Sequence, residues 1–233
     1  MMMDIFSSFD DQNFTTFSMS PLIWGFGILP SLIIQSSFWS KWSRGIGLIS
    51  FVESFMYEQV SRTLGKRISG FSNIVVSIFI FLMLVNLLGL FPYVFSLSSH
   101  LSFAFCFGLP FWFSLILSGS IFNLSEVVSH FLPSGAPSIL NPFLVLVESV
   151  SIMVRPVTLS VRLSANMSAG HIILGLIGSY LGFGIFSYSY IVLFGLIFVQ
   201  VFYFIFEVGI SLIQAYIFSL LITLYSEDHP CNT

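Results

Sequence analysis

Polar side chains recur at a helical spacing in two long apolar stretches of the C-terminal half of the sequence. Positions seven residues apart return to within about 20° of one direction on an α-helix, because each residue turns the helix by about 100°. One face of the first stretch holds Glu148, Arg155, Arg162 and Ala169, with Ser151, Thr158 and Asn166 on the same side. The corresponding face of the second stretch holds Gln200, Glu207 and Gln214, with Ser211 beside them. Each stretch is therefore predicted to be a helix with a narrow polar stripe.

The chemistry of these side chains suits the movement of protons. An ionisable group inside a bilayer costs about 2.5–3.5 kcal/mol or more, so it is expected to face protein or water and to have a function. A histidine such as His171 has an ordinary pKa near ~6.5 and exchanges protons around neutral pH. With the Glu207 carboxylate it would form a proton relay. For the hydroxyl groups and Asn166, a seam that only joins two helices is an equally good interpretation.

Arg162 calls for a different role, because a guanidinium does not release its proton in proteins. It is predicted to be a fixed positive barrier and a counter-ion for a carboxylate. Glu148 is fourteen residues away, so that carboxylate is expected on a partner. Gln214 can donate and accept hydrogen bonds without adding charge.

The elements that position these groups follow from the length of the two stretches, residues 139–181 and 183–225. Each is roughly twice as long as one membrane crossing, and we favour two long tilted helices over four short crossings. A single antiparallel hairpin that turns near Tyr188 and Ser189 would place His171 opposite Glu207. It would also place Arg162 opposite Gln214.

Composition places the chain in a membrane. Only 7% of the 233 residues are charged and 56% are hydrophobic, whereas a soluble domain is normally about a quarter charged. The sequence contains no GxGxxG, P-loop or HExxH motif, and its two cysteines support neither a disulfide framework nor a metal site. We expect no cofactor, no bound metal, no nucleic acid, and no small-molecule substrate other than protons.

The apolar runs divide a single membrane domain into five parts: an N-terminal segment 1–20, a first crossing 21–35, an amphipathic interfacial segment 36–70, a helical hairpin 71–124 and a long hairpin 138–226. The hairpin 71–124 is predicted as helices over 71–97 and 101–124. The fold class is therefore an all-α integral membrane protein with about five membrane helices, an interfacial amphipathic helix and a C-terminal hairpin of two long tilted helices.

The segment 36–70 contains five of the seven basic residues, interleaved with apolar side chains. This pattern is typical of a helix lying in a membrane interface, and its charge favours the inner face. A plain loop on that side is the alternative.

Several residues keep two interpretations. Glu126 and His130, four residues apart, could line an aqueous entrance or make a local hydrogen bond or headgroup contact. Arg155, directly before Pro156, could mark a helix irregularity or a water-filled vestibule. The glycines of the first long stretch are expected to allow close helix packing; they are Gly170, Gly175, Gly178 and Gly182.

Five segments in order resemble subunit a of the F-type ATP synthase: LVNLLGLFPYVF, HFLPSGAPSILNPFLVLVE, SIMVRPVTLSVRL, VRLSANMSAGHIILGLIG and LIQAYIFSLLITLY. The resemblance covers most of the chain from about residue 71 to 225. The order of His171 before Glu207 is similar to mitochondrial members, since bacterial members usually carry the pair in the opposite order. The resemblance thus implies the mitochondrial inner membrane.

The resemblance also implies a mechanism. The chain would be a non-catalytic stator subunit beside a rotating ring of c subunits, with other stator subunits and the lipid bilayer as its remaining partners. Arg162 matches the arginine that faces the ring carboxylate and separates two offset proton half-channels, and Asn166 and Gln214 match its polar neighbours. His171 and Glu207 would line the outward half-channel, and Glu148 matches an acidic position of the matrix-side half-channel.

A secondary transporter coupled to ions or protons is the rival class. Such a protein is expected to show an internal repeat and broken helices at the midplane, and the sequence shows no repeat. With the basic segment in the matrix and five crossings, the C-terminal tail is expected in the matrix and the N-terminus on the opposite side.

Overall fold

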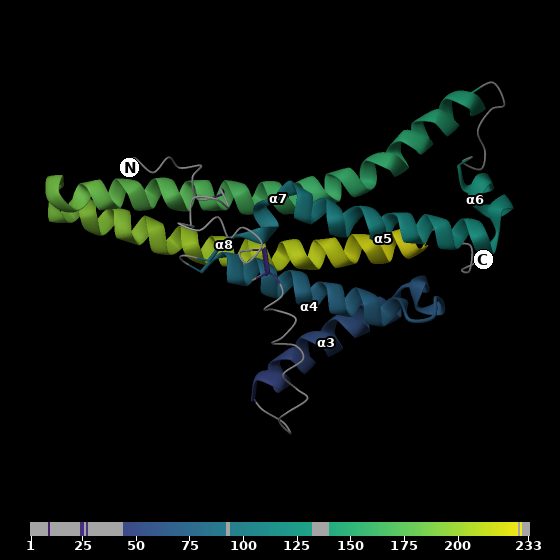
Figure 1. Cartoon of the computed structure of the whole chain (residues 1–233), viewed down its shortest axis with the longest axis horizontal. Coiled ribbons are helices and arrows are strands. Elements are labelled where there is room, and N and C mark those ends of the chain that lie inside the picture. The colour runs from purple at the N-terminus through teal and green to yellow at the C-terminus, as the bar shows by residue number, and fades with distance from the viewer. Residues whose placement is uncertain are drawn as a thin grey trace.

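The structure is a computed structural model, and it describes residues 9, 24–25, 27, 44–91, 94–131, 140–227 and 229. Six α-helices and two short 3-10 helices make up this part of the chain. The helices lie along one long direction, and two of them extend far beyond the others (Figure 1). The all-α prediction is confirmed for these residues. Most of the segments 1–20, 21–35 and 131–142 lies outside them.

The first hairpin consists of α4 (Phe71–Gly89) and α5 (Leu101–Phe122), both long and apolar enough to cross a membrane. The predicted end of its first helix, at residue 97, is wrong, because α4 ends at Gly89. The sequence explains this difference: Pro92 follows three residues later, and the residue before a proline is disfavoured in the α conformation. The connection includes the 3-10 helix η5 (Leu97–Ser99), and a short helix, α6 (Leu124–His130), follows α5.

The second hairpin consists of α7 (Asn141–Ser187) and α8 (Tyr190–Glu227), with 47 and 38 residues. At about 1.5 Å per residue these helices are about 70 and 57 Å long. Neither breaks into two crossings, and the turn falls at Tyr188 and Ser189, as predicted. Together with α4 and α5 they are the four described helices with the length and composition to span a membrane.

The helix α7 is bent, so that its N-terminal part diverges from α8 (Figure 1). Pro156 lies inside this helix. A proline lacks the N–H that would close the helical hydrogen bond, and its ring clashes with the carbonyl one turn earlier, which kinks a helix. One turn later, the hydroxyl of Ser160 donates to the carbonyl of Pro156 at 2.9 Å. Across the contact, Gly108 of α5 packs against Pro156, and a β-carbon there would lie at an ordinary contact distance of 3.5 Å from the Pro156 carbonyl oxygen.

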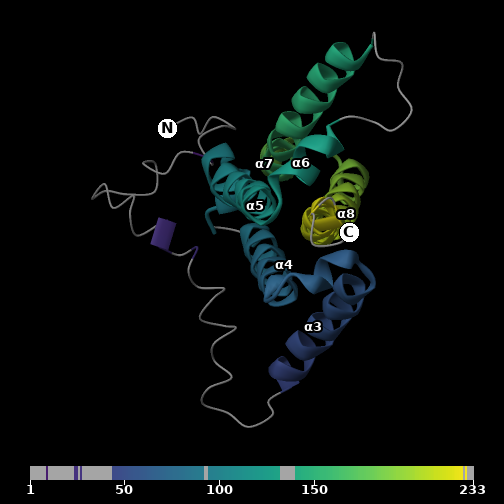
Figure 2. The same ribbon diagram turned by 90° about the vertical axis from the view of Figure 1, so that its right-hand side faces the viewer.

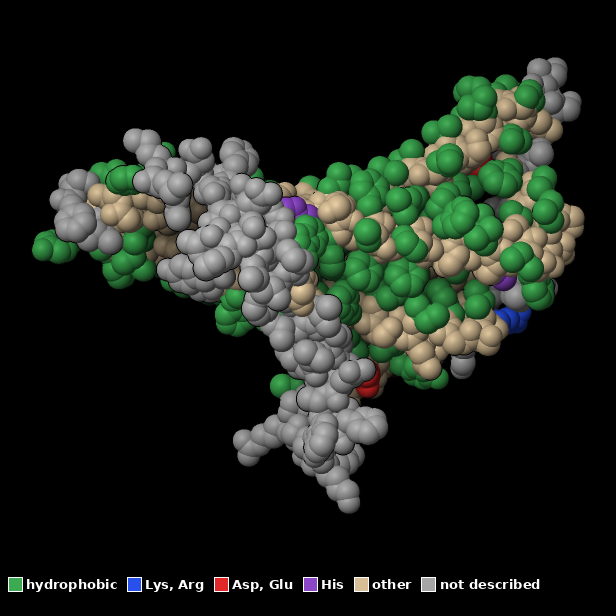
Figure 3. Space-filling model, in the orientation of Figure 1, with side chains coloured by type: hydrophobic (Ala, Val, Ile, Leu, Met, Phe, Trp, Pro, Cys, Tyr) green, Lys and Arg blue, Asp and Glu red, His purple; other side chains and the backbone are tan. Residues whose placement is uncertain are grey.

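The core lies where α4, α5, the middle of α7 and the C-terminal half of α8 meet. It includes Val75 and Leu82 of α4, Leu163 of α7, and Ala215 and Phe218 of α8, all nearly or fully buried. The other halves of α7 and α8 pack mainly on each other and leave large apolar side chains exposed, such as Phe194 at 73%. Hydrophobic side chains are spread over the described part of the face in Figure 3, and few charged side chains lie among them. Such a surface fits a bilayer or partner subunits rather than water.

The amphipathic segment contains α3 (Arg44–Arg62) and the 3-10 helix η4 (Leu64–Arg67). The helix α3 packs against α4 at an angle to the main bundle (Figure 2). A β-carbon at Gly65 would overlap the hydroxyl of Ser226, so η4 lies at the end of α8. The basic segment and the end of the last helix are therefore at the same end of the bundle, which agrees with the topology expected from the charges.

Candidate functional site

The two long helices meet through polar side chains near the middle of the hairpin. Asn166 of α7 donates its side-chain amide to the side-chain oxygen of Gln214 of α8 at 2.9 Å. Gln214 is almost fully buried, whereas Asn166 is exposed on its other side. The amide pair thus links the interior of the helix contact to the outer face of α7.

Glu207 lies on the same face of α8 as Gln214, two helical turns closer to the hairpin turn. Its side chain is only 1% exposed, and its carboxylate lies against Gly170 of α7, where a β-carbon would overlap it. Among the described residues its Oε1 atom has no hydrogen-bond partner. Gly170 therefore makes room for a buried carboxylate between two helices.

His171 is the next residue after Gly170, and it is half-buried. Its ring makes an edge-to-face contact with Phe9, with centroids 6.3 Å apart, and its Nε2 atom has no partner within the described part of the chain. The structure thus brings His171 and Glu207 to the same region, but it gives no hydrogen bond between them.

Arg162 lies on the exposed side of α7, between Val161 and the buried Leu163. Within the described residues it makes no ion pair and no hydrogen bond. The expected contact of Arg162 with Gln214 is not formed, because the observed register places Asn166 opposite Gln214, one helical turn further along.

A second polar group lies near the other end of the hairpin. Glu148 and Arg155 form an ion pair at 3.8 Å, and the Arg155 guanidinium lies 5.4 Å from the centre of the Tyr225 ring. Arg155, Tyr225 and His229 line a cavity of about 110 Å³ between α5, α7 and α8. Both interpretations of Arg155 fit this geometry, because a cavity lies beside it and the helix contains Pro156 at the next position.

His229 follows α8 and is 7% exposed. One of its ring nitrogens, Nε2, lies 3.1 Å from the hydroxyl of Ser118 on α5, and its ring packs near Phe122. Burial lowers the pKa of this imidazole below its ordinary value. Sequence reasoning did not single out His229, because it lies outside the apolar stretches.

Asn86 is another residue that sequence reasoning missed. It is fully buried in α4 and donates its side-chain amide to the backbone carbonyl of Ser211 on α8 at 3.3 Å. A lone asparagine within the apolar run FLMLVNLLGL was the available signal. The contact ties the first hairpin to the polar face of α8, between Glu207 and Gln214.

The expected role of four glycines in close packing is wrong for three of them. Gly175, Gly178 and Gly182 have open space where a side chain would lie, so they do not allow a close helix contact within the described part. Gln200 is half-buried, and Glu126 lies in the first turn of α6. The side chain of His130 lies outside the described residues.

Along α7 the polar groups fall in a definite order. Arg162 lies about 21 Å from Glu148 and about 13 Å from His171, at 1.5 Å per residue. One group, with Arg155 and a cavity, lies toward the start of α7, and the other, with Glu207, lies toward the hairpin turn. An exposed arginine therefore separates two polar regions of one helical hairpin.

These features define an all-helical, multi-pass membrane protein with its ionisable groups arranged along a long hairpin. The chain belongs to the family of subunit a of the ATP synthase: the family described as ATP synthase A chain matches residues 16–227. The ATP synthase subunit a of Locusta migratoria is 40% identical over 98% of this chain and 99% of its own length. That of Drosophila melanogaster is 35% identical over the same shares, and that of the snail Albinaria caerulea is 36% identical over 99% and 100%.

Membership in this family gives the chain its activity. It is the proton-translocating stator subunit of the membrane sector of the synthase, and it is a channel subunit rather than a catalytic one. Its relatives are animal proteins of the mitochondrial type, and its long apolar helices make it a multi-pass protein of that membrane.

Proposed function

We propose that Arg162 is the fixed charge that separates two proton half-channels and faces the carboxylates of a ring of c subunits. The observation that carries this proposal is the exposure of Arg162 on α7, without a partner among the described residues, between two polar regions. A guanidinium costs too much to be left in lipid without a counter-charge. A carboxylate on a moving partner supplies that charge intermittently.

The electrostatic effect of Arg162 is large enough for this role. At about 4 Å and an effective dielectric constant of about 20, two unit charges attract by about 4 kcal/mol. One pKa unit corresponds to about 1.36 kcal/mol, so a passing carboxylic acid would be about three units more acidic beside Arg162. The acid would release its proton there, and the guanidinium could not carry that proton onward.

The first half-channel consists of His171, Glu207, Asn166 and Gln214. Glu207 has a free carboxylate oxygen in the helix contact, and His171 lies beside Gly170, against which that carboxylate packs. Water between the imidazole and the carboxylate would connect the two groups. The Asn166–Gln214 hydrogen bond continues this route toward the exposed face of α7, one turn from Arg162.

The second half-channel begins at Glu148. The cavity lined by Arg155, Tyr225 and His229 is open enough for water and lies at the end of the bundle where the basic 3-10 helix η4 is found. The positive-inside rule assigns that end to the matrix. Protons would leave the ring through Glu148 and this cavity.

Replacement of Arg162 tests the proposal. In Arg162→Ala, ATP-driven proton pumping by the assembled synthase in vesicles should fall to background, and passive proton leak through the membrane sector should increase. Arg162→Lys keeps the charge, but the flexible ammonium can lose its proton when it is desolvated, so partial activity is expected.

The matched control is Arg62→Ala, which also removes one arginine. Arg62 lies on α3 in an exposed ion pair with Glu58 at 2.6 Å, and such pairs contribute little to stability. This variant should pump at the unmodified rate. Coupled pumping by Arg162→Ala at that same rate would overturn the proposal.

A further inference from the structure

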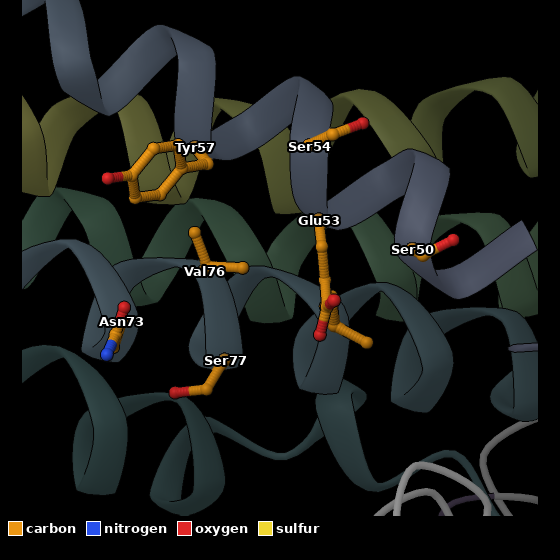
Figure 4. Close-up of a pocket in the computed structure, with 8 residues that line it drawn as sticks. Ser50, Glu53, Ser54, Tyr57, Asn73, Val76 and Ser77 are labelled. Carbon is orange, nitrogen blue, oxygen red and sulfur yellow. The ribbon is translucent and has the colours of Figure 1, made fainter. Parts of the chain in front are cut away.

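An open cleft lined by polar and apolar side chains lies between α3 and α4, away from the proton path (Figure 4). It has a volume of about 470 Å³ and is lined by Ser50, Glu53, Ser54 and Tyr57 of α3 and by Asn73, Val76, Ser77 and Ile80 of α4. Binding pockets for small ligands are typically about 300–1,000 Å³. The Glu53 side chain extends from α3 toward α4, into the space between the two helices (Figure 4).

The polar groups of this cleft are mainly hydrogen-bond acceptors. The hydroxyls of Ser50, Ser54 and Ser77 already donate to backbone carbonyls one turn earlier, at 3.0, 2.8 and 2.8 Å. Their oxygen atoms keep lone pairs that can act as acceptors. The Glu53 carboxylate and the side-chain oxygen of Asn73 add further acceptors. The cleft therefore suits a ligand that brings several N–H donors.

The negative charge of Glu53 also favours a ligand that carries N–H donors. Glu53 makes no ion pair within the described part of the chain, and no basic side chain is among the residues that line the cleft. Glu58, five residues later on α3, differs because Arg62 neutralises it. The cleft thus holds one uncompensated negative charge and favours a cationic ligand.

The surroundings of the cleft are apolar and exposed. Leu48, Phe51 and Phe55 form a stripe three to four residues apart on α3, and Ile74 of α4 is also exposed. A separate stripe of α3, including Met56 and Val60, is buried against the core. A helix with an exposed apolar stripe beside a polar one lies in the plane of a membrane interface. In that position the cleft would be at the depth of lipid headgroups, and the apolar stripe would be at the depth of their acyl chains.

We propose that this cleft binds the headgroup of an ethanolamine phospholipid. The primary ammonium donates to Glu53 and to the serine and asparagine oxygens, while the Tyr57 hydroxyl lies at the rim, where it can donate to the phosphate. A choline headgroup carries a cation of equal charge but has no N–H to donate, so the site discriminates by hydrogen bonding rather than by charge. Such a lipid fills the angle between the interfacial helix and α4.

Photo-crosslinking on the complete synthase tests this site. The delipidated complex in detergent is incubated with photoactivatable phosphatidylethanolamine or phosphatidylcholine, and labelled peptides are mapped by mass spectrometry. Peptides of α3 and the first half of α4 should carry about tenfold more ethanolamine lipid than choline lipid, the effect expected for hydrogen bonds to a charged group. In Glu53→Gln this preference should decrease, because a neutral amide oxygen is a weaker acceptor than a carboxylate.

The matched control is Glu58→Gln, which removes a carboxylate from the same helix outside the cleft and should keep the full preference. Equal labelling of the unmodified complex by the two lipids would by itself overturn the proposal, whatever the variants show. A carbodiimide crosslink from Glu53 to a lysine of another subunit, with no lipid label in the cleft, would overturn it in favour of a protein partner. Because labelling does not depend on proton transport, this result is separate from the outcome for Arg162.

Discussion

At the scale of single residues, Gly170 controls the position of the carboxylate on the proposed proton path. A methyl group at this position would overlap the Glu207 carboxylate, so the end of this buried side chain would have to move. In Gly170→Ala we expect proton transport to decrease on the order of ten- to a hundredfold, because displacements of about 1 Å can cost that much when groups must be aligned. ATP-driven acidification of synthase vesicles measures this change.

The helix offers a close control for this substitution. Gly175 lies five residues further along α7, and a β-carbon there meets no other atom within 4 Å. Gly175→Ala should therefore transport protons at the unmodified rate, with a small gain in helix stability. Equal loss in both variants would show that alanine disturbs α7 itself, and no loss in Gly170→Ala would show that Glu207 needs no room there.

The residues of the site could be chosen from the sequence, but their partners could not. The seven-residue spacing and the cost of charge in a bilayer select Arg162, Glu207 and Gln214 without a structure. The pairing depends on where two helices turn relative to each other. Gln214 was expected to contact Arg162, but a shift of one helical turn places it against Asn166 instead. No local sequence pattern predicts such a shift.

At the scale of elements, the segment after α8 is held to α5 by a titratable contact. His229 is buried beside Ser118, and its pKa is lowered by burial. The detached segment has the ordinary pKa of about 6.5, so it binds a proton more readily than the docked one as the pH falls. Docking is therefore at full strength above about pH 6.5 and weakens as the pH falls below that value.

Hydrogen exchange of the peptide that contains Ser226 and His229 measures this effect in the assembled synthase. After correction for intrinsic rates, protection should decrease between pH 7.5 and 5.5. His229→Gln keeps a hydrogen-bonding side chain but cannot titrate, and its protection should be independent of pH. An unchanged pH dependence in this variant would assign the effect to another group, such as those around the Arg155 ion pair that borders the same cavity.

The elements themselves were more predictable than their ends. The turn at residues 188–189 follows from Gly and Ser in an otherwise apolar run, and the bend of α7 has a proline at Pro156. The proline-containing connection after α4 was harder to predict, because Pro92 marks a boundary but does not give the length of the helix before it. The helix α4 therefore ends earlier than expected, at Gly89.

At the scale of the whole molecule, the length of α8 conflicts with the thickness of a membrane. The helix is about 57 Å long, whereas the hydrocarbon core is about 30 Å thick. Its exposed residues are apolar near both ends, from Phe194 to Leu220. An upright helix would leave such side chains in water, at about 25 cal/mol for each Å² of apolar surface. Tilting keeps them in lipid or against partners at a cost of only fractions of a kcal/mol per Å of mismatch.

Spin labels at Phe194 and Leu220 distinguish these orientations. The two positions are 26 residues apart, which is about 39 Å along the helix and more than an upright helix can place in the hydrocarbon core. In a tilted helix both labels should be poorly accessible to a water-soluble nickel relaxant, in the assembled synthase in liposomes. A label at Glu227, the exposed last residue of α8, should be readily accessible and serves as the control. High nickel accessibility at Phe194 would show an upright helix with the hairpin turn outside the membrane. The two long helices would then contact the ring over a much shorter length.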